Sequence, residues 1–186
     1  ENVSQNNNIN TSKEGTNKIR HEDGGPAFYS QERIGKNEKP FKMWKFRSMV
    51  VNADQMIDQL EDQNEIEGAM FKIKDDPRIT KIGHTIRKYS LDELPQLWNV
   101  LIGDMSLVGP RPPLPSEVEE YTDYDKQRLL VMPGCTGLWQ VTKRNEADFD
   151  EMVWLDIVYI NHSGILEDLK LIIKTIGVVI HPNGAY

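Results

Sequence analysis

The chain has 186 residues, 38% of them hydrophobic, and a mean hydropathy of −0.56, which together indicate one soluble globular domain with a core of its own. A formal net charge of −7 excludes a general nucleic-acid binder, so we expect no nucleic-acid partner. The single cysteine, Cys135, excludes an internal disulfide and favours a reducing cytoplasm.

The first 24 residues are rich in Asn, Ser, Gly and charge, and we predict a disordered polar tail over 1–24. No stretch of the chain reaches the ~18 to 20 apolar residues of a membrane-spanning helix, and the polar start Glu1–Thr16 is not a secretory signal. A chain that begins with Glu is expected to be a fragment or a processed product. Residues 25–186 are expected to form one domain.

Two extended segments follow the tail, Ala27–Arg33 and Phe41–Met49, joined by the polar turn Gly35–Pro40. This pattern predicts a small β-hairpin. If the second segment is a strand, the period-two alternation places Lys45 and Arg47 on one face.

Helical periodicity dominates the rest of the chain, and residues 133–141 read as a loop or short strand. The sequence therefore predicts an α+β fold: a mainly helical single domain with a small β-hairpin near the N-terminus and amphipathic helices. The predicted helices cover 52–64, 92–100, 116–132, 149–160 and 165–180.

The last predicted helix has an apolar side with lysines on the other side, Lys170 and Lys174. Such a stripe usually packs into a core, and the alternative is a helix that binds a membrane surface. The stripe consists of Leu166, Leu169, Ile173, Ile176 and Ile180.

The most informative stretch runs from Lys88 to Pro112. It places two adjacent carboxylates, Asp92 and Glu93, at the start of an amphipathic helix, and a rigid turn with Arg111 between prolines on the far side of that helix. Acidic side chains that can attack or bind a metal, together with a fixed guanidinium, suit the handling of phosphate.

A purely structural reading competes with this one. Ser90 and Glu93 fit a capping box, with the carboxylate and the hydroxyl bonding free backbone N–H groups. Pro95 falls beyond the first turn if Ser90 is the cap, and inside it if Asp92 is the cap. Local pattern alone favours capping over catalysis, although it explains only one of the two acids. In this reading the apolar positions form a buried stripe of Leu91, Leu94, Leu97, Trp98 and Leu101.

Six sequence segments that occur together in one order favour catalysis over capping. Together, from about Gly25 to Tyr186, they resemble the catalytic domain of the bacterial sugar transferase family, the monotopic polyprenol-phosphate phosphoglycosyl transferases. The segments are Phe28–Gly35, Lys45–Met49, Asp76–Thr80, Ser90–Gln96, Gly103–Pro112 and Pro133–Val141.

The resemblance implies transfer of a hexose 1-phosphate from a UDP-sugar to undecaprenyl (polyprenol) phosphate with release of UMP. This is the first step of exopolysaccharide or capsule biosynthesis. Asp92 matches the nucleophile that carries a covalent phosphosugar, and a helix start would favour its negative charge. Glu93 is implied as the partner of Mg²⁺, a cation that takes oxygen ligands.

Other site residues also follow from the resemblance. Asp168 aligns with a further acid that serves as a second ligand or base, while a plain polar position on an amphipathic helix explains it equally well. Arg87 and Arg111 match phosphate-binding positions, and Lys45 is a third candidate. After Gln-Val the family often has Ser-Gly, where this chain has Thr142–Asn145.

The family places a hydrophobic re-entrant helix where this chain has its polar start. The resemblance implies work at the cytoplasmic face of the bacterial cell membrane, and we expect this chain itself to be soluble. The alternative is a catalytically silent module that binds a nucleotide-sugar or a partner. No motif distinguishes glucose from galactose.

Overall fold

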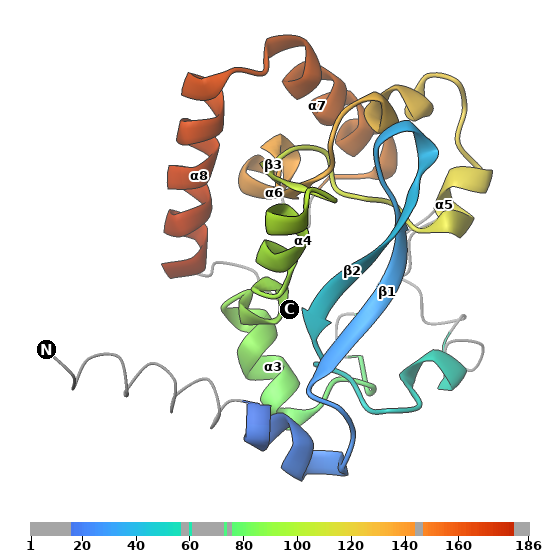
Figure 1. Ribbon diagram of the computed structural model, residues 1–186, viewed down its shortest axis with the longest axis vertical. Coiled ribbons are helices and arrows are strands. Elements are labelled where there is room, and N and C mark those ends of the chain that lie inside the picture. Colours follow the sequence, from blue (N-terminus) through green and yellow to red (C-terminus); the bar gives the residue numbers. More distant parts are fainter. Residues whose placement is uncertain (1–15, 57–59, 61–72, 74–75, 144–146, 181–186) are drawn as a thin grey trace, which may run out of the picture.

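A computed structural model describes residues 16–56, 60, 73, 76–143 and 147–180 (Figure 1). Residues 16–23 form an N-terminal helix. The elements after it, with 3₁₀ helices marked η, are β1 (Phe28–Ile34), η1 (Lys36–Glu38), β2 (Pro40–Phe46), η2 (Ala53–Met56), α3 (Lys81–Lys88), η4 (Leu91–Glu93), α4 (Gln96–Ile102), β3 (Ser106–Val108), α5 (Pro115–Glu119), η5 (Asp125–Leu130), β4 (Gly134–Thr136), α6 (Leu138–Thr142), α7 (Phe149–His162) and α8 (Ile165–Ile180).

The predicted hairpin is confirmed. Strands β1 and β2 pair antiparallel, with Phe28 opposite Phe46 at one end and Ile34 opposite Pro40 at the turn. The hairpin runs diagonally across the molecule, with α4 and η4 against β2 and α5 against β1 (Figure 1). At its tip the Ile34 N–H donates to the Pro113 carbonyl at 2.9 Å, so the hairpin holds the chain just after Arg111.

A second, two-stranded sheet fixes the start of the Gly-Pro-Arg-Pro turn. Strands β3 and β4 pair in parallel, with Val108 opposite Thr136. The backbones approach so closely beside this pair that a Cβ on Gly109 would lie 2.5 Å from the Met132 carbonyl oxygen. Only glycine fits at such a contact, and the turn therefore leaves the sheet in a defined direction.

The predicted tail boundary needs correction. Residues 1–15 lie outside the described part, but 16–23 are helical and Ile19 is buried against Ala27 and Ile86. This cluster joins the N-terminal helix to the hairpin and α3. An apolar side chain with partners in the core orders a segment whose composition is otherwise polar.

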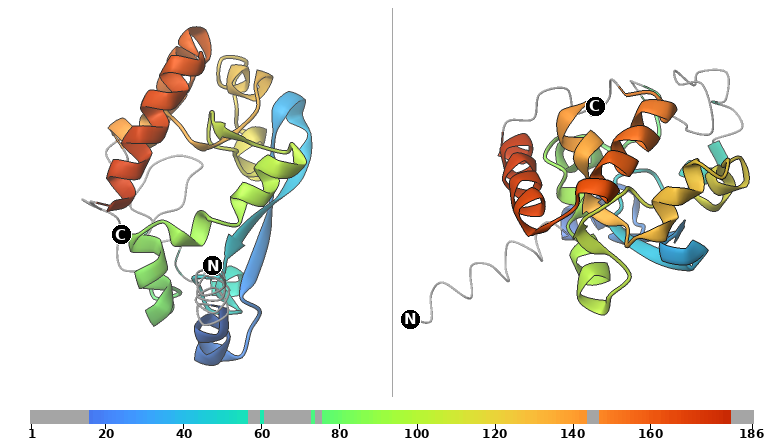
Figure 2. Two further views of the ribbon diagram at one scale, coloured as in Figure 1. Left: turned by 60° about the vertical axis from the view of Figure 1, so that its left-hand side comes forward. Right: turned by 90° about the horizontal axis from the view of Figure 1, so that it is seen from above.

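Helix α7 packs on α6 through a second buried cluster that contains Trp139, Met152 and Leu155. The predicted helices 149–160 and 165–180 are confirmed as α7 and α8. Figures 1 and 2 show α8 at one edge of the molecule, connected to the rest by α7. Its inner side contacts α6, β3 and β4.

Two predicted helices differ from the structure. The helix expected over 116–132 is broken into α5 and η5, because the Asp125 carboxylate accepts from both the N–H and the hydroxyl of Thr122, each at 2.8 Å. This side-chain turn competes with a continuous helix. Of the helix expected over 52–64, the structure describes η2 and the helical, buried Leu60, and the rest lies outside the described residues.

The predicted orientation of α4 is wrong. Its apolar side chains face outward, with Leu101 79% exposed, while Asn99 is fully buried. The Asn99 amide accepts from the Trp44 N–H at 3.0 Å and donates to the Lys42 carbonyl at 2.8 Å and to Asp104 at 3.1 Å. Helix α4 is therefore attached to β2 by polar contacts, which leaves exposed Leu91, Leu94, Leu97, Trp98 and Leu101.

The core-packing interpretation of the α8 stripe is also wrong. Leu171 is the buried member of this helix, and Thr175 faces inward to bond Thr136 at 2.8 Å. The stripe faces outward and is at least half exposed: Leu166, Leu169, Ile173, Ile176 and Ile180. None of the helices that the structure describes is both long and apolar enough to cross a membrane.

The α+β architecture, mainly helical with a small hairpin near the N-terminus, is as predicted. Helices α4 and α8 remain amphipathic as expected, but each presents its apolar face to the outside.

Candidate active site

A tight turn sets the position of the two acids. Ser90 takes a left-handed conformation with φ of 52°, and η4 follows at once. The Ser90 side chain makes no capping hydrogen bond, so the capping box does not form. Helix α4 begins at Gln96, not at Asp92 as predicted, and Asp92 lies on the 3₁₀ turn before it.

Asp92 is buried, with 9% of its surface exposed. Burial and the adjacent Glu93 carboxylate raise the pKa of Asp92 to about 6, while the nearby cations Lys45 and Arg87 act to lower it. Three charged groups that were predicted site residues thus lie within electrostatic range of this carboxylate. At neutral pH, Asp92 is mainly an ionised but poorly hydrated carboxylate, which is what a nucleophile requires.

Lys45 reaches Glu93 from strand β2. Its ammonium donates to Glu93 Oε1 at 3.3 Å. Burial lowers the pKa of Lys45, and the Glu93 carboxylate opposes this shift. The contact brings the hairpin and the acidic pair together, although Lys45 and Glu93 are 48 residues apart in the sequence.

Arg87 comes from the last turn of α3. Thr80 caps the start of this helix by accepting from the Gly83 N–H. The Arg87 guanidinium donates through Nε to the Ser48 hydroxyl at 2.8 Å, which fixes its direction. Burial lowers the pKa of Arg87, and the nearby Asp92 carboxylate opposes this shift.

Arg47 does not join Lys45 as the strand alternation suggested. Strand β2 ends at Phe46, and the Arg47 guanidinium forms a bidentate pair with Asp23, at 2.5 and 2.6 Å. It also donates to the Pro26 carbonyl at 2.6 Å. Arg47 therefore attaches the N-terminal helix to the hairpin and does not face Glu93.

Arg111 is held by two buried arginines that sequence reasoning missed. Arg33 donates to the Pro112 carbonyl at 3.2 Å, and Arg128 lies 3.5 Å from the carbonyl of Arg111 itself. Burial and the Arg111 charge lower the pKa of Arg33 to about 10. Arg111 also acts on the pKa of Lys45, so both belong to the same cluster of charges. Arg33 lies in a recognised motif, but nothing in the sequence indicated its partner.

Arg128 is itself neutralised by an acid on α7. Its guanidinium pairs with the Asp156 carboxylate at 2.5 Å and donates to the Tyr121 hydroxyl at 2.9 Å. Asp156 is fully buried. Because Arg128 also contacts the Arg111 carbonyl, this ion pair supports the backbone of the turn.

Asp168 is held outside this cluster. It accepts a hydrogen bond from the Tyr159 hydroxyl at 2.8 Å, near the start of α8. Burial and this carboxylate raise the pKa of Tyr159. The stretch of α8 nearest the acids includes Thr175, which lies about 10 Å further along the helix axis.

The part of the chain that the structure describes holds no group of three or more His, Cys, Asp or Glu side chains that could bind a metal ion. Magnesium, however, commonly takes one or two protein carboxylates and completes its shell with substrate phosphates and water. The half-exposed Glu93 beside Asp92 fits that need. Burial raises the pKa of the Cys135 thiol to about 11, so this cysteine is not a nucleophile at neutral pH.

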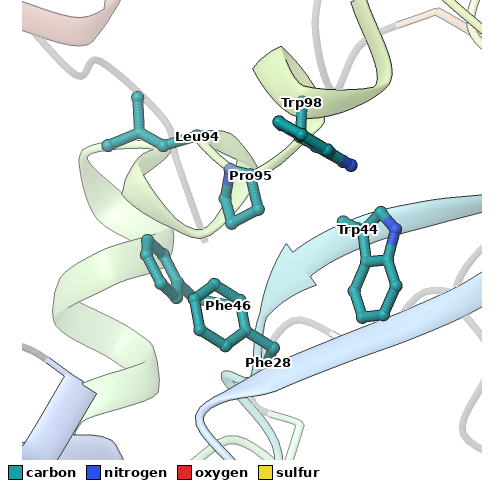
Figure 3. Close-up of a pocket in the computed structure, with 6 residues that line it drawn as sticks. All are labelled: Phe28, Trp44, Phe46, Leu94, Pro95 and Trp98. Atoms are coloured by element: carbon teal, nitrogen blue, oxygen red, sulfur yellow. The ribbon is translucent and has the colours of Figure 1, made fainter. Parts of the chain in front are cut away.

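An apolar hollow of about 450 Å³ opens next to the acidic turn. Figure 3 shows aromatic rings from the hairpin facing Pro95 and the indole of Trp98. The rings of Phe28 and Phe46 pack with their centroids 5.1 Å apart. Leu94 and Pro95 line the hollow and follow Glu93 directly in the sequence, so it adjoins the charged site.

Comparison with known proteins agrees with the family that the sequence motifs indicate. The sequence profile described as bacterial sugar transferase matches residues 16–182. The chain belongs to this family. The matched region begins at the first described helix, which supports the corrected boundary of the folded domain.

Several relatives share 40 to 55% of the aligned residues with this chain. Galactosyl transferase CpsE of Streptococcus agalactiae is 55% identical over 88% of this chain. Undecaprenyl-phosphate galactose phosphotransferase of Salmonella typhimurium is 48% identical over 88%. The chain spans about a third of the length of these two proteins, 36% and 35%. Exopolysaccharide production protein ExoY of Sinorhizobium fredii is 41% identical over 90% of the chain, which covers 76% of that relative.

Proposed function

We propose that this chain transfers a hexose 1-phosphate from a UDP-sugar to undecaprenyl phosphate, with release of UMP, as the first step of exopolysaccharide or capsule biosynthesis. One observation supports this most strongly: the buried Asp92 lies beside Glu93 within reach of the charges of Lys45 and Arg87. The names of the relatives from Salmonella and Streptococcus, an undecaprenyl-phosphate galactose phosphotransferase and a galactosyl transferase, point to the same reaction.

The reaction takes place in two displacements at one phosphorus. A carboxylate oxygen of Asp92 attacks the phosphorus that bears the sugar, the bond from this phosphorus to the oxygen of UMP breaks, and UMP leaves with the electron pair. Asp92 then carries the phosphosugar as an acyl phosphate. A phosphate oxygen of undecaprenyl phosphate attacks the same phosphorus, and the Asp92 carboxylate leaves.

The cations around Asp92 are suited to neutralise the negative charge on the phosphates of the donor. Arg87 and Arg111 present guanidinium forks suited to phosphate oxygens, and the buried pair of arginines behind Arg111 fixes its backbone. Lys45 offsets the Glu93 carboxylate and adds a point charge at the same place. These groups are arranged before substrate binds, so they stabilise developing negative charge without reorganisation.

Mg²⁺ would be held by Glu93 together with phosphate oxygens of the donor, and when bound it would neutralise charge on the diphosphate. For Asp168 we propose no contact with the reacting phosphorus, because its carboxylate is engaged by the Tyr159 hydroxyl. Its role is to hold the start of α8 on α7.

The exposed apolar faces support a lipid acceptor. Helices α4 and α8 both direct leucine and isoleucine side chains outward, and Lys170 and Lys174 on α8 are exposed as well. Apolar side chains with flanking lysines suit the surface of an anionic membrane. We therefore propose that the chain works at the cytoplasmic face of the bacterial inner membrane, with the apolar hollow beside Pro95 open to the lipid acceptor.

Release of UMP tests the proposal. The purified chain is incubated with Mg²⁺ and a panel of UDP-sugars, with and without a short polyprenol phosphate. We expect UMP from at least one donor, and none from the Asp92→Asn variant. If the wild-type chain binds a UDP-sugar but never releases UMP, it is the catalytically silent binding module instead.

A further inference from the structure

A second hollow, of about 200 Å³, also borders the acidic turn. Its walls come from the Ser90–Glu93 turn, strand β4, helix α6 and the C-terminal half of α8. The hydrogen bond between the hydroxyls of Thr136 and Thr175, at 2.8 Å, joins two of these walls. Whereas the first hollow has an almost wholly apolar lining, this wall mixes valines and Trp139 with polar groups and the Glu93 carboxylate.

Two buried polar atoms in this wall have no hydrogen-bond partner in the described part of the chain. They are the indole Nε1 of Trp139 and the side-chain oxygen Oε1 of Gln140. Buried polar groups without a partner are rare, because each costs roughly 1–3 kcal/mol relative to water. One donor and one acceptor without a partner thus belong to consecutive residues that line the hollow.

The chemistry of the wall selects the kind of ligand. An N–H donor, an amide oxygen and hydroxyls of threonine and serine suit a neutral group with several hydroxyls. None of the described residues that line the hollow is a lysine or an arginine, so a second phosphate would find no cation there. The volume is below the roughly 300–1,000 Å³ of a site for a drug-sized ligand, so it suits one ring and not a whole sugar nucleotide.

The position relative to Asp92 selects which part of the donor enters. Ser90 and Glu93 line the hollow, and they flank Asp92 on either side in the same turn. A group in the hollow therefore lies beside the turn that carries Asp92. The part of the donor best placed to enter the hollow is the group attached directly to the phosphorus that Asp92 attacks. In a sugar nucleotide that group is the sugar, since the nucleoside is separated from this phosphorus by a second phosphate.

We propose that this hollow holds the hexose of the donor, with the Trp139 N–H donating to one sugar hydroxyl and Gln140 Oε1 accepting from another. The inference rests on the proposed function, and it goes further by assigning sugar recognition to residues of α6. Trp139 is suited to this role because Met152 and Leu155 pack against it and fix the ring.

Two conservative variants test the assignment. Trp139→Phe keeps the aromatic packing and removes the donor, and Gln140→Met keeps the length and removes the acceptor. Their matched controls are Trp154→Phe and Gln127→Met, at exposed positions of α7 and η5. UMP release is measured with UDP-linked glucose, galactose and N-acetylgalactosamine, and binding of UMP and of the corresponding hexose 1-phosphates is measured by calorimetry.

Each test variant is expected to lower kcat/KM for the preferred donor about two- to tenfold, the effect of one hydrogen bond. The affinity for UMP should stay unchanged, which also shows that the variants are folded. An equal loss of UMP affinity would place the nucleoside in the hollow and overturn the proposal. So would test variants that behave like their controls.

The failure of the proposed function would look different. If the wild-type chain released UMP from no donor, the proposed transfer would be refuted. Binding of hexose 1-phosphate would still test whether the hollow holds the sugar. Weaker binding by Trp139→Phe and Gln140→Met than by wild type would support the sugar site. Equal binding, or none by the wild type, would overturn it.

Discussion

Replacing Asp92 with Asn should abolish activity and at the same time stabilise the fold. The pKa of this carboxyl rises from 3.8 to about 6 on folding, because the group is buried beside Glu93. Each pKa unit corresponds to about 1.4 kcal/mol, so the ionised form costs the folded state up to about 3 kcal/mol. The amide has nearly the same shape and no charge, so this cost disappears in the variant.

The effect depends on pH with a defined sign. Between pH 4 and 6 the folded chain holds a proton on Asp92 that the unfolded chain has released, so stability falls as pH rises through this window. Below pH 4 the carboxyl is protonated in both states and wild type and variant should be alike. The gain of Asp92→Asn should appear between pH 4 and 6 and reach about 2–3 kcal/mol at pH 7.5.

Urea unfolding of both proteins at pH 4 and pH 7.5, followed by circular dichroism, measures this difference. Asp123→Asn, at an exposed position, serves as the control and should match wild type at both pH values. An Asp92→Asn variant less stable than wild type at pH 7.5, or equally shifted at both pH values, would refute the electrostatic description of the site.

Three further predictions concern activity and the support of the site. UMP release should decline as pH falls through about 6, where Asp92 becomes protonated, and a flat profile down to pH 5 would contradict the assignment. Arg111→Lys, which keeps the charge and loses the fork, should lower kcat strongly with little change in Tm, and near-normal turnover would leave only a structural role. Asp156→Asn should reduce the free energy of unfolding by about 3–5 kcal/mol in urea titrations, because Arg128 stays buried without its counter-charge. A loss below 1 kcal/mol would contradict it.

A double variant tests the membrane face on its own. Leu101→Ser with Ile173→Ser removes two exposed apolar side chains, one from α4 and one from α8. Stability should change by less than about 0.5 kcal/mol, since neither packs in the core. Flotation with anionic vesicles should weaken, and unchanged flotation would show that these faces do not contact the lipid.

The sequence predicted the hairpin, both C-terminal helices and the cluster of Lys45, Arg87, Asp92 and Glu93. Alternation and periodicity of apolar residues predict strands and helices, and the roles expected for the site residues came from the ordered motifs. Ser90 illustrates what local sequence cannot predict. The sequence is compatible with a capping box, but Ser90 adopts a left-handed backbone conformation instead, because tertiary contacts decide between these two local conformations.

The two amphipathic helices were harder to orient. Periodicity shows that α4 and α8 have an apolar face, but it does not show whether that face meets the core or another apolar phase. Asn99 sets the orientation of α4, because its amide forms hydrogen bonds with two backbone groups of β2. No pattern in the sequence identified this residue. Arg33 and Arg128 were missed for a related reason, because their partners Pro112 and Asp156 are distant in the sequence.

The covalent intermediate is the most direct test of the account. Intact-protein mass spectrometry after brief exposure to the UDP-hexose whose UMP is released, without lipid acceptor, should show wild-type chain heavier by one hexose phosphate. Peptide mapping should locate the added mass on Asp92, and addition of a polyprenol phosphate should remove it. An adduct that persists in Asp92→Asn, or UMP release with no adduct on wild type at any time, would contradict the role assigned to Asp92.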